Sequence, residues 1–252
     1  MSDPILIVQD LSVTFLDDSG STVSQAGLEA LDSASFTVNP QEFVCVLGPS
    51  GSGKSTLLRV LAGLLQPTSG SFTFPAGQPR IGMVFQQANL MPWRTTIENV
   101  VLPLELQGVP AEEACARAQD LIGLVGLQGF ENAWPRDLSG GMAQRVAIAR
   151  ALVHDPDILL LDEPFGSLDA LTRERMWDEL SRIWQRRQKT VLMVTHSINE
   201  ALFLADRVLV LTQRPGRIKL DLAVDLPRPR PDEIRYTAHF GRLARRLKEA
   251  IG

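Results

Sequence analysis

A glycine-rich segment, Gly48–Ser55, contains the residue types that bind phosphate groups. Its sequence, GPSGSGKS, matches G-x-x-x-x-G-K-[ST] and lies between an apolar run at Phe43–Leu47 and a helical pattern at Lys54–Gly63. Glycines allow a tight turn whose amide N–H groups point inward, and a following helix N-terminus attracts anions. A polar surface turn is the alternative, but the flanking strand and the Lys-Ser pair favour a nucleotide phosphate site.

The side chains of this segment have the chemistry that ATP and Mg²⁺ require. We expect Lys54, in a solvent-facing cleft, to reach the β- and γ-phosphates, and Ser55 to offer its hydroxyl to Mg²⁺. The predicted ATP-binding residues of the segment are Gly48, Pro49, Ser50, Gly51, Ser52, Gly53, Lys54, Ser55 and Thr56.

A short apolar strand farther along the chain, Ile158–Leu161, ends in the two carboxylates Asp162 and Glu163. The end of this strand is predicted to lie beside the phosphate segment, where Asp162 can hold Mg²⁺ through a water molecule. Glu163 points elsewhere and is predicted to orient or deprotonate the attacking water. Many strands end in acidic residues, so this motif gains its meaning from the phosphate segment upstream.

A third motif, Leu138–Arg145 (LSGGMAQR), opens a helix over Met142–Leu152 with a serine and two glycines. Such an opening provides a second possible anion site, because amide N–H groups and the helix dipole meet there. From physical chemistry alone, an ordinary serine-capped helix is an equally good interpretation.

The surrounding pattern predicts the elements that position these motifs. Apolar strands at Ile158–Leu161, Val191–Val194 and Arg207–Thr212 alternate with helices, which indicates a parallel sheet covered on both faces. A helical block from about Thr96 to Leu152 precedes this alternation and is predicted to be an inserted subdomain.

Two capping boxes and a terminal amphipathic pattern are also visible. Thr95–Glu98 and Ser197–Glu200 predict helix starts. Residues 231–252 are predicted to form a helix packed on the body. Its apolar positions are Tyr236, Phe240, Leu243, Leu247 and Ile251.

Composition excludes several classes of protein. The chain has 252 residues, of which 44% are hydrophobic and 21% charged, as in soluble globular proteins. No run reaches the ~18 apolar residues that span a bilayer, and Met1–Gln9 does not look like a secretory leader. Segment 226–252 carries +4 and the remainder −8, so we expect no nucleic-acid partner. Cys45 and Cys115 are expected to be reduced thiols in a cytoplasmic protein.

Together, the three motifs resemble the signature arrangement of ABC ATPases over essentially the whole chain. LSGGMAQR, with GPSGSGKS before it and LLLDEP after it, carries the resemblance. It implies an α/β fold that contains a P-loop NTPase core with a mostly parallel sheet, an N-terminal antiparallel β subdomain and an inserted α-helical subdomain. The implied ATPase domain is 1–230, with the helical subdomain at about 87–155 and the C-terminal helix at 231–252.

The resemblance also implies roles for residues outside the phosphate segment. Gln86 is similar to a glutamine that contacts Mg²⁺ and senses a membrane subunit, and His196 to a histidine that contacts the γ-phosphate. Ser167 and Asp169 resemble a loop that crosses a dimer interface. Phe15 stands where the family stacks an aromatic ring on adenine, although a buried strand phenylalanine is an equal alternative.

In this family two chains pair head to tail, so the resemblance implies a homodimer with two ATP sites. Glu163 would be the main catalytic group, assisted by His196. The residues implied to contact the partner's nucleotide are Ser139, Gly140, Gly141 and Gln144.

Four segments resemble ATPases of bacterial nitrate, sulfonate and taurine importers: LMPWRT, DEPFGSLDALTR, RPGRI and LPRPR. This likeness implies a peripheral subunit on the cytoplasmic face of the plasma membrane, two permease subunits and an extracytoplasmic substrate-binding protein. An ABC ATPase acting on ribosomes or DNA is disfavoured by the single phosphate segment and the absence of heptads. An exporter ATPase is disfavoured by the importer-like segments.

Leu90, Met91 and Trp93 surround a proline shortly after Gln86. We interpret them as a groove that receives a permease helix, with Gln86 linking that groove to the Mg²⁺ site. The alternative is that they fill the seam between the sheet and the helical subdomain.

Overall fold

The computed structural model describes residues 3–15, 27–166 and 168–252. The chain divides into two compact units, the first made of residues 1–78 and 190–252, the second of residues 79–189. Within the described ranges, no helix combines the length and apolar character needed to cross a membrane. The division into 1–230 and 231–252 stays a prediction.

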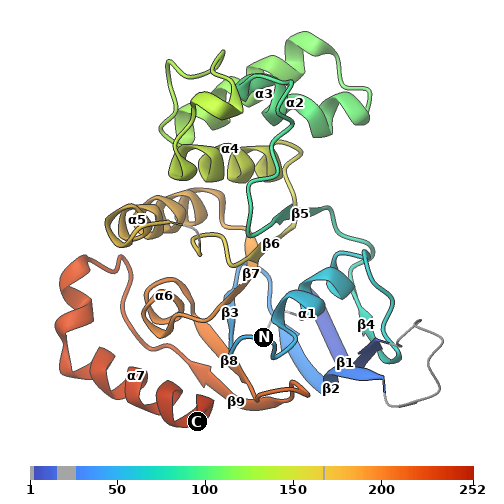
Figure 1. Cartoon of the computed structure of the whole chain (residues 1–252), viewed down its shortest axis with the longest axis vertical. Coiled ribbons are helices and arrows are strands. Elements are labelled where there is room, and N and C mark those ends of the chain that lie inside the picture. The colour runs from blue at the N-terminus through green and yellow to red at the C-terminus, as the bar shows by residue number, and fades with distance from the viewer. Residues whose placement is uncertain (1–2, 16–26, 167) are drawn as a thin grey trace. The chain divides into compact units, whose positions relative to one another are not determined.

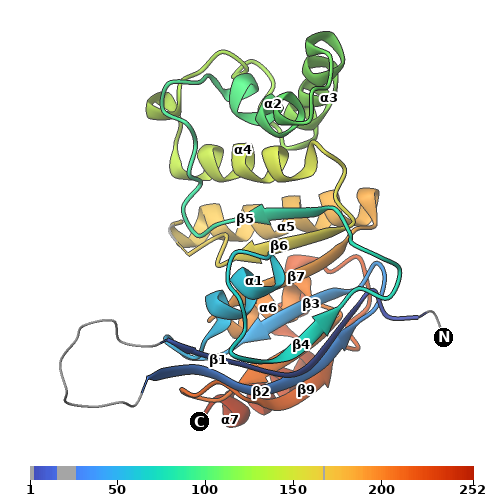
Figure 2. The same ribbon diagram turned by 90° about the vertical axis from the view of Figure 1, so that its right-hand side faces the viewer.

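An antiparallel sheet forms one part of the first unit (Figure 2). Its central strand, β1, pairs with β2 on one side and β4 on the other. These strands cover Leu6–Phe15, Leu28–Val38 and Ser69–Thr73. The predicted antiparallel subdomain is therefore confirmed.

A second group of strands in the first unit has the order β7-β3-β8-β9. They cover Thr190–Thr195, Phe43–Leu47, Arg207–Leu211 and Ile218–Ala223. Strand β3 is parallel to both β7 and β8, and β3 and β7 are buried at every position, as continuous apolar runs predict. Strand β9, which the sequence analysis did not predict, pairs antiparallel with β8.

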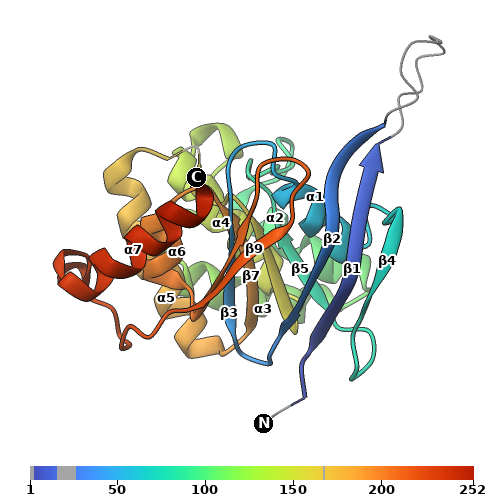
Figure 3. The ribbon, with the colours of Figure 1, turned by 90° about the horizontal axis from the view of Figure 1, so that it is seen from below.

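The helices of the first unit follow strands β3, β7 and β9 in the sequence. The set comprises α1 (Lys54–Leu61), α6 (Ile198–Leu204), the 3₁₀ helix η2 (Asp232–Tyr236) and α7 (Ala238–Ile251). Helix α7 lies beside α6 (Figure 3) and buries Phe240, Leu243 and Leu247, which confirms the predicted packing. Tyr236 is 84% exposed and precedes the helix, so its assignment to the apolar face was wrong.

The second unit contains two parallel strands, β5 (Ile81–Val84) and β6 (Ile158–Asp162), and most of the helices. The helices α2 and α3 pack on α4 (Figure 1), which confirms the predicted helical block. Their bounds, with those of η1 and α5, are Thr96–Leu106, Ala111–Leu124, Gly140–Leu152, Pro135–Asp137 and Ala170–Arg187.

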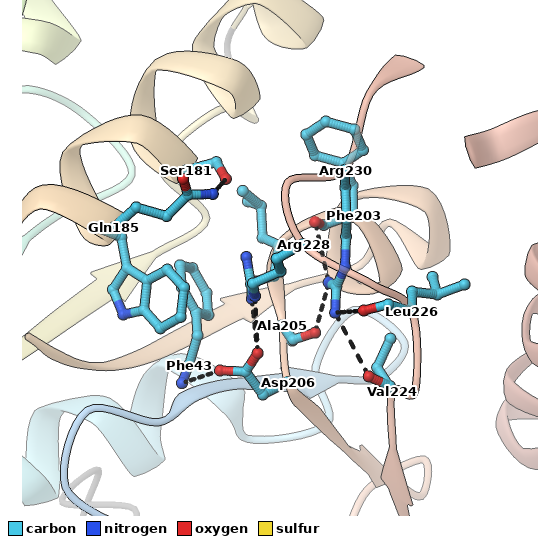
Figure 4. A network of polar contacts seen from close by, with 12 residues as sticks. Phe43, Ser181, Gln185, Phe203, Ala205, Asp206, Val224, Leu226, Arg228 and Arg230 are labelled. Carbon is cyan, nitrogen blue, oxygen red and sulfur yellow. Dashed lines mark hydrogen bonds and ion pairs between the residues drawn. The ribbon is translucent and has the colours of Figure 1, made fainter. Parts of the chain in front are cut away.

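Two arginines bind the end of α6 to the segment that leads into α7 (Figure 4). Arg230 is 5% exposed, and its guanidinium donates to five backbone carbonyls. These belong to Leu202, Phe203, Ala205, Val224 and Leu226. Arg228 donates to Leu204 O and to Asp206, whose other oxygen accepts the N–H of Phe43. We call Arg228, Arg230 and Asp206 the arginine clamp.

Replacing Arg230 by alanine is expected to lower the free energy of unfolding by roughly 3 kcal/mol, because buried carbonyls lose their donors. Burial lowers the pKa of Arg230 to about 10, as expected for a cation poorly solvated by water. Denaturant unfolding measures the loss, with Arg242→Ala on the exposed side of α7 as the control. Equal stability of the two variants would show that the clamp is unimportant.

Candidate functional site

The phosphate segment connects β3 to α1 in the conformation that its glycines predict. Gly51 and Gly53 have φ values of 79° and 87°, which L-residues rarely adopt. A Cβ atom on Gly53 would lie 2.5 Å from the carbonyl oxygen of Ala30, so this position also lacks room for a side chain. Ser50 and Gly51 are exposed at the turn.

Lys54 lies inside this loop. Its Nζ donates to the carbonyl oxygens of Gly48 and Pro49, both at 2.9 Å. The residue is only 4% exposed, so the expectation that it faces solvent was wrong: the loop curls around the ammonium group. Ser55 and Thr56, in the first turn of α1, are half-buried.

The donor set of this loop fits an anionic ligand. It combines one ammonium, the hydroxyls of Ser55 and Thr56, and backbone N–H groups at the start of α1. Ser52 is fully buried, and its Oγ finds no hydrogen-bond partner in the part of the chain that the structure describes. A Cβ on Gly51 would meet none of the described residues within 4 Å, so none of them blocks the turn at this point.

His196 belongs to the same unit and to the same edge of the sheet. Leu47 pairs with Thr195 in parallel register, so the strands before the phosphate segment and before His196 end side by side. The imidazole is exposed. The structure thus brings His196 and the phosphate loop together at the carboxyl ends of β3 and β7.

The turn after His196 differs in detail from a capping box. Ser197 Oγ accepts the N–H of Glu200, as predicted. The carboxylate of Glu200, however, bonds to the hydroxyl of Thr195, which in turn accepts the N–H of Ser197. Thr195 therefore replaces the direct return bond of the box and ties the histidine turn to the end of β7.

Phe15 ends β1, where it pairs with Leu28. Its side chain is 40% exposed, which removes the alternative of a fully buried strand phenylalanine. An exposed ring at a strand end has a free face for stacking. The contact with adenine stays a prediction.

In the second unit, Gln86, Asp162 and Glu163 follow the ends of two paired strands. Val84 of β5 pairs with Leu161 of β6 in parallel register. Gln86 and Glu163 both lie near Gly166: a Cβ atom there would lie 3.6 Å from Gln86 Nε2 and 3.7 Å from Glu163 Oε2. Both polar side chains therefore lie close to Gly166, in the turn that follows β6.

Backbone geometry singles out Glu163 within this group. Its φ is +43°, a left-handed conformation that is uncommon for residues other than glycine. Such strain is often found at functional positions. Asp162, by contrast, ends β6 and is 5% exposed.

Oxygen donors suited to Mg²⁺ are present in both units: Ser55 in the first, Asp162 and Gln86 in the second. Across the described ranges, no cluster of three His, Cys, Asp or Glu residues could hold a metal on its own. In the second unit, a carboxylate and an amide oxygen are ligands that Mg²⁺ can take together with phosphate and water.

The LSGGMAQR motif begins α4 as predicted. Ser139 is the N-cap, and its Oγ accepts the N–H of Met142 at 3.3 Å. Ser139 and Gly140 are exposed, whereas a Cβ on Gly141 would lie 2.8 Å from the methyl group of Thr172. The exposed serine and glycine can therefore meet another molecule, while Gly141 allows α4 to approach α5.

Gln144 points into its own unit. It is 2% exposed, and its Nε2 donates to the carbonyl oxygen of Phe85, directly before Gln86. This burial argues against direct contact with a partner's nucleotide. It instead makes Gln144 a link between the signature helix and the Gln86 segment.

Of the two predicted dimer-loop residues, Ser167 lies outside the described residues. Asp169 is the N-cap of α5, and its Oδ1 accepts the N–H of Thr172. Hydrogen bonds from the Thr172 hydroxyl and amide hold the pKa of Asp169 below its usual value. Its carboxylate is therefore engaged in capping.

The segment Leu90–Trp93 is held by a residue that the sequence analysis missed. Asn99 of α2 is fully buried, accepts the N–H of Met91 at 2.7 Å, and donates to the carbonyls of Met91, Arg94 and Thr95. Trp93 is 69% exposed, whereas Leu90 and Met91 are half-buried. The core-filling alternative is therefore wrong for Trp93.

A second missed residue, Arg150 of α4, donates to the carbonyls of Ala88 and Asn89. Helix α4 thus fixes the segment after β5 through both Gln144 and Arg150. Only long-range side-chain contacts reveal these roles, and no local motif signals them.

Comparison with known proteins gives one consistent match. A family model described as ABC transporter matches residues 31–166. The chain is 48% identical over 228 residues to the nitrate import ATP-binding protein NrtD of Synechocystis sp., covering 88% of this chain and 83% of that protein. It is also 48% identical over 230 residues to the taurine import ATP-binding protein TauB of Rhizobium johnstonii, covering 89% and 86%.

A solved structure agrees with the sequence matches. It is a dimeric, post-hydrolysis structure of an ATP-binding cassette bound to ADP and Pi. The TM-score is 0.75 and the identity 32%, and the match covers 88% of this chain and 100% of that chain.

Proposed function

Because this chain belongs to the ABC transporter family of ATP-binding proteins, we propose that its ATP hydrolysis energises import of a small anionic nutrient such as nitrate, a sulfonate or taurine. The observation that carries the proposal is the loop Gly48–Thr56 closed around the ammonium of Lys54, in a chain similar to importer ATP-binding proteins over nearly its whole length. Nitrate is itself an oxyanion, and taurine and the other sulfonates carry a sulfonate group.

Uptake assays in a deletion strain test this function. Nitrate, taurine, other sulfonates, cyanate and pyrimidine vitamin precursors are offered in turn, and the intact gene is returned as the control. We expect one class of uptake to disappear and to be restored by the gene. Unchanged uptake of all of them would contradict the proposal.

The ATP chemistry divides among residues of the two units. Lys54 and the N–H groups of the loop bind the β- and γ-phosphates. Glu163 accepts a proton from the attacking water, and His196 contacts the γ-phosphate. The exposure of His196 at the end of β7 and the unusual φ of Glu163 support these assignments.

Mg²⁺ would be held by Ser55, Asp162 and Gln86, and when bound it would neutralise charge on the phosphate oxygens. The position of Gln86 and Glu163 beside the same residue, Gly166, supports a role for Gln86 in reporting on this site. Asp162 is almost fully buried, and its carboxylate is the kind of oxygen ligand that would bind Mg²⁺.

Two copies of the chain would form a head-to-tail homodimer in which each nucleotide lies between one phosphate loop and the partner's Ser139–Gly141. The exposure of Ser139 and Gly140 supports this arrangement. Ser167 and Asp169 would lie at the same interface, while Gln144 would position the motif from within. The dimer would be peripheral, docked on two permease subunits at the cytoplasmic face of the plasma membrane, and an extracytoplasmic protein would deliver substrate.

Coupling to the permease would use Leu90, Met91 and Trp93, which Asn99 holds in a fixed conformation. Substituting Met91→Asp or Trp93→Ala should leave ATP hydrolysis by the isolated subunit within about twofold, because neither residue belongs to the proposed ATP site. Truncating a large interface anchor typically costs 2 kcal/mol or more. Co-purification with the permease should therefore fall at least about 30-fold, as a difference of that size in binding free energy implies.

Leu64→Asp provides a matched control, because Leu64 is a 62% exposed leucine of the other unit. It should assemble normally. If the Met91 and Trp93 variants lose several degrees of melting temperature yet still assemble, the cluster is structural and the coupling role is wrong.

A further inference from the structure

A cavity of about 560 Å³ lies between the start of α6 and the last turns of α7, both in the first unit. These helices lie side by side (Figure 3). One wall contains the proposed catalytic histidine, and the other belongs to the C-terminal helix. The lining residues are His196, Ser197, Ile198, Asn199, Ala244, Arg245 and Lys248.

The polar groups of this lining favour an anion. Arg245 and Lys248 are three residues apart on α7 and therefore share a face. Both are exposed, and among the described residues neither forms an ion pair. Ser197 and Asn199 add a hydroxyl and an amide, and the lining includes no carboxylate.

Two acidic residues close in sequence to the lining residues, Glu200 and Glu249, do not belong to the lining. Glu200 is 4% exposed and bonds to the hydroxyl of Thr195. Glu249, one residue beyond Lys248, does not line the cavity. The positive charge of Arg245 and Lys248 is therefore not neutralised within it.

The arginine clamp joins the far end of α6 to the segment that leads into α7 (Figure 4). Arg230 binds the carbonyls that end α6 and, at the same time, the Val224 and Leu226 carbonyls of the segment leading to α7. Arg228 adds a bond to Leu204 O. The clamp thus fixes the connection between the two helices, which lowers the cost of ordering them when a ligand binds.

We propose that this cavity binds a small oxyanion, a phosphate or sulfonate group, through Arg245 and Lys248, and that the bound anion lowers ATP hydrolysis by holding His196 toward α7. The second part rests on the proposed function, in which His196 contacts the γ-phosphate. An anion that bonds both to the turn containing His196 and to α7 stabilises the arrangement in which His196 is held away from the γ-phosphate.

Calorimetric titration tests the site without measuring activity. Inorganic phosphate and ethanesulfonate are titrated separately into the full chain with ADP–Mg²⁺ in excess, so that the phosphate loop is already filled. The two titrations distinguish a product of hydrolysis from a nutrient-like sulfonate. Arg245→Ala/Lys248→Ala should weaken binding of at least one anion about tenfold or more, because charge-assisted contacts are lost.

Arg242→Ala/Arg246→Ala is the matched control, since it removes two exposed cations from the same helix but none from the cavity. It should bind the anion within about twofold of the unmodified protein. Equal affinity of the Arg245/Lys248 variant and the unmodified protein overturns the site. Equal weakening by both double variants also overturns it, because binding would then reflect general electrostatics.

ATP hydrolysis tests the regulatory part. The anion should lower the rate of the unmodified protein severalfold, whereas the Arg245/Lys248 variant should keep its basal rate and lose the response. Binding without any change in rate overturns the regulation. A protein that binds the anion but never hydrolyses ATP leaves the cavity supported and overturns the proposed function instead.

Discussion

Replacing Glu163 by glutamine is expected to lower ATP hydrolysis by roughly 10²–10⁴-fold, the range associated with loss of a general base. Glutamine keeps the size and hydrogen-bonding capacity of the side chain but accepts no proton at neutral pH. ATP should still bind, because the phosphate loop is formed by other residues, Gly48–Thr56, which the substitution leaves unchanged. The ATP-bound dimer should accumulate, which size-exclusion chromatography with ATP can detect.

The left-handed backbone at Glu163 makes glutamine the appropriate substitution, because both residues carry the same strain there. Glu112→Gln, an exposed change on α3, controls for the loss of one negative charge. Near-normal turnover in the Glu163 variant would remove the catalytic role assigned to it. Loss of ATP binding would instead indicate that the side chain supports the fold of the site.

Local motifs predicted the parts of the site that depend on a few neighbouring residues. The strand, loop and helix around Gly48–Thr56 follow directly from an apolar run, glycines with positive φ and a helix start. The capping box at Thr95 and Glu98 was confirmed for the same reason. Such features need no knowledge of the rest of the chain.

Features that depend on distant residues were not predictable in this way. Lys54 is buried because the loop folds back on it, and no pattern in the loop signals that closure. Asn99 and Arg230 donate hydrogen bonds to backbone carbonyls of other segments. In the sequence, nothing distinguishes these two residues from other polar residues. Their roles emerge only when the chain is folded.

Two incorrect predictions, the omission of strand β9 and the early start of the C-terminal helix, could have been avoided from the sequence. Strand β9 alternates Ile218, Leu220 and Leu222 with polar or small residues, the period expected of a strand beside a partner. The helical pattern beginning at Tyr236 ignored Thr237, whose Oγ accepts the N–H of Phe240 and caps α7. An N-cap residue marks the start of a helix more reliably than the first apolar position does.

The second large effect is expected at the exposed start of α4, where Gly140→Asp should abolish cooperative hydrolysis while ATP binding by the monomer stays intact. Among the described residues, a Cβ on Gly140 meets only Leu168, at 3.7 Å, so the substitution fits this part of its own chain. In the proposed head-to-tail dimer, however, the new carboxylate would face the partner's γ-phosphate and repel it. We expect the hydrolysis rate to fall at least about 10²-fold, comparable with the loss of a stabilising donor in an active site.

Gly140→Ala separates the charge from the steric effect, because it adds the same Cβ without the carboxylate. It should retain most of the activity, whereas Ser139→Arg should be as inactive as Gly140→Asp because of its bulk. Gly141 is unsuitable for this comparison, since a Cβ there would lie 2.8 Å from Thr172 and disturb the packing of α4 on α5. If monomeric Gly140→Asp loses ATP binding, measured with a fluorescent nucleotide, the motif serves the nucleotide of its own chain and the sandwich arrangement is wrong.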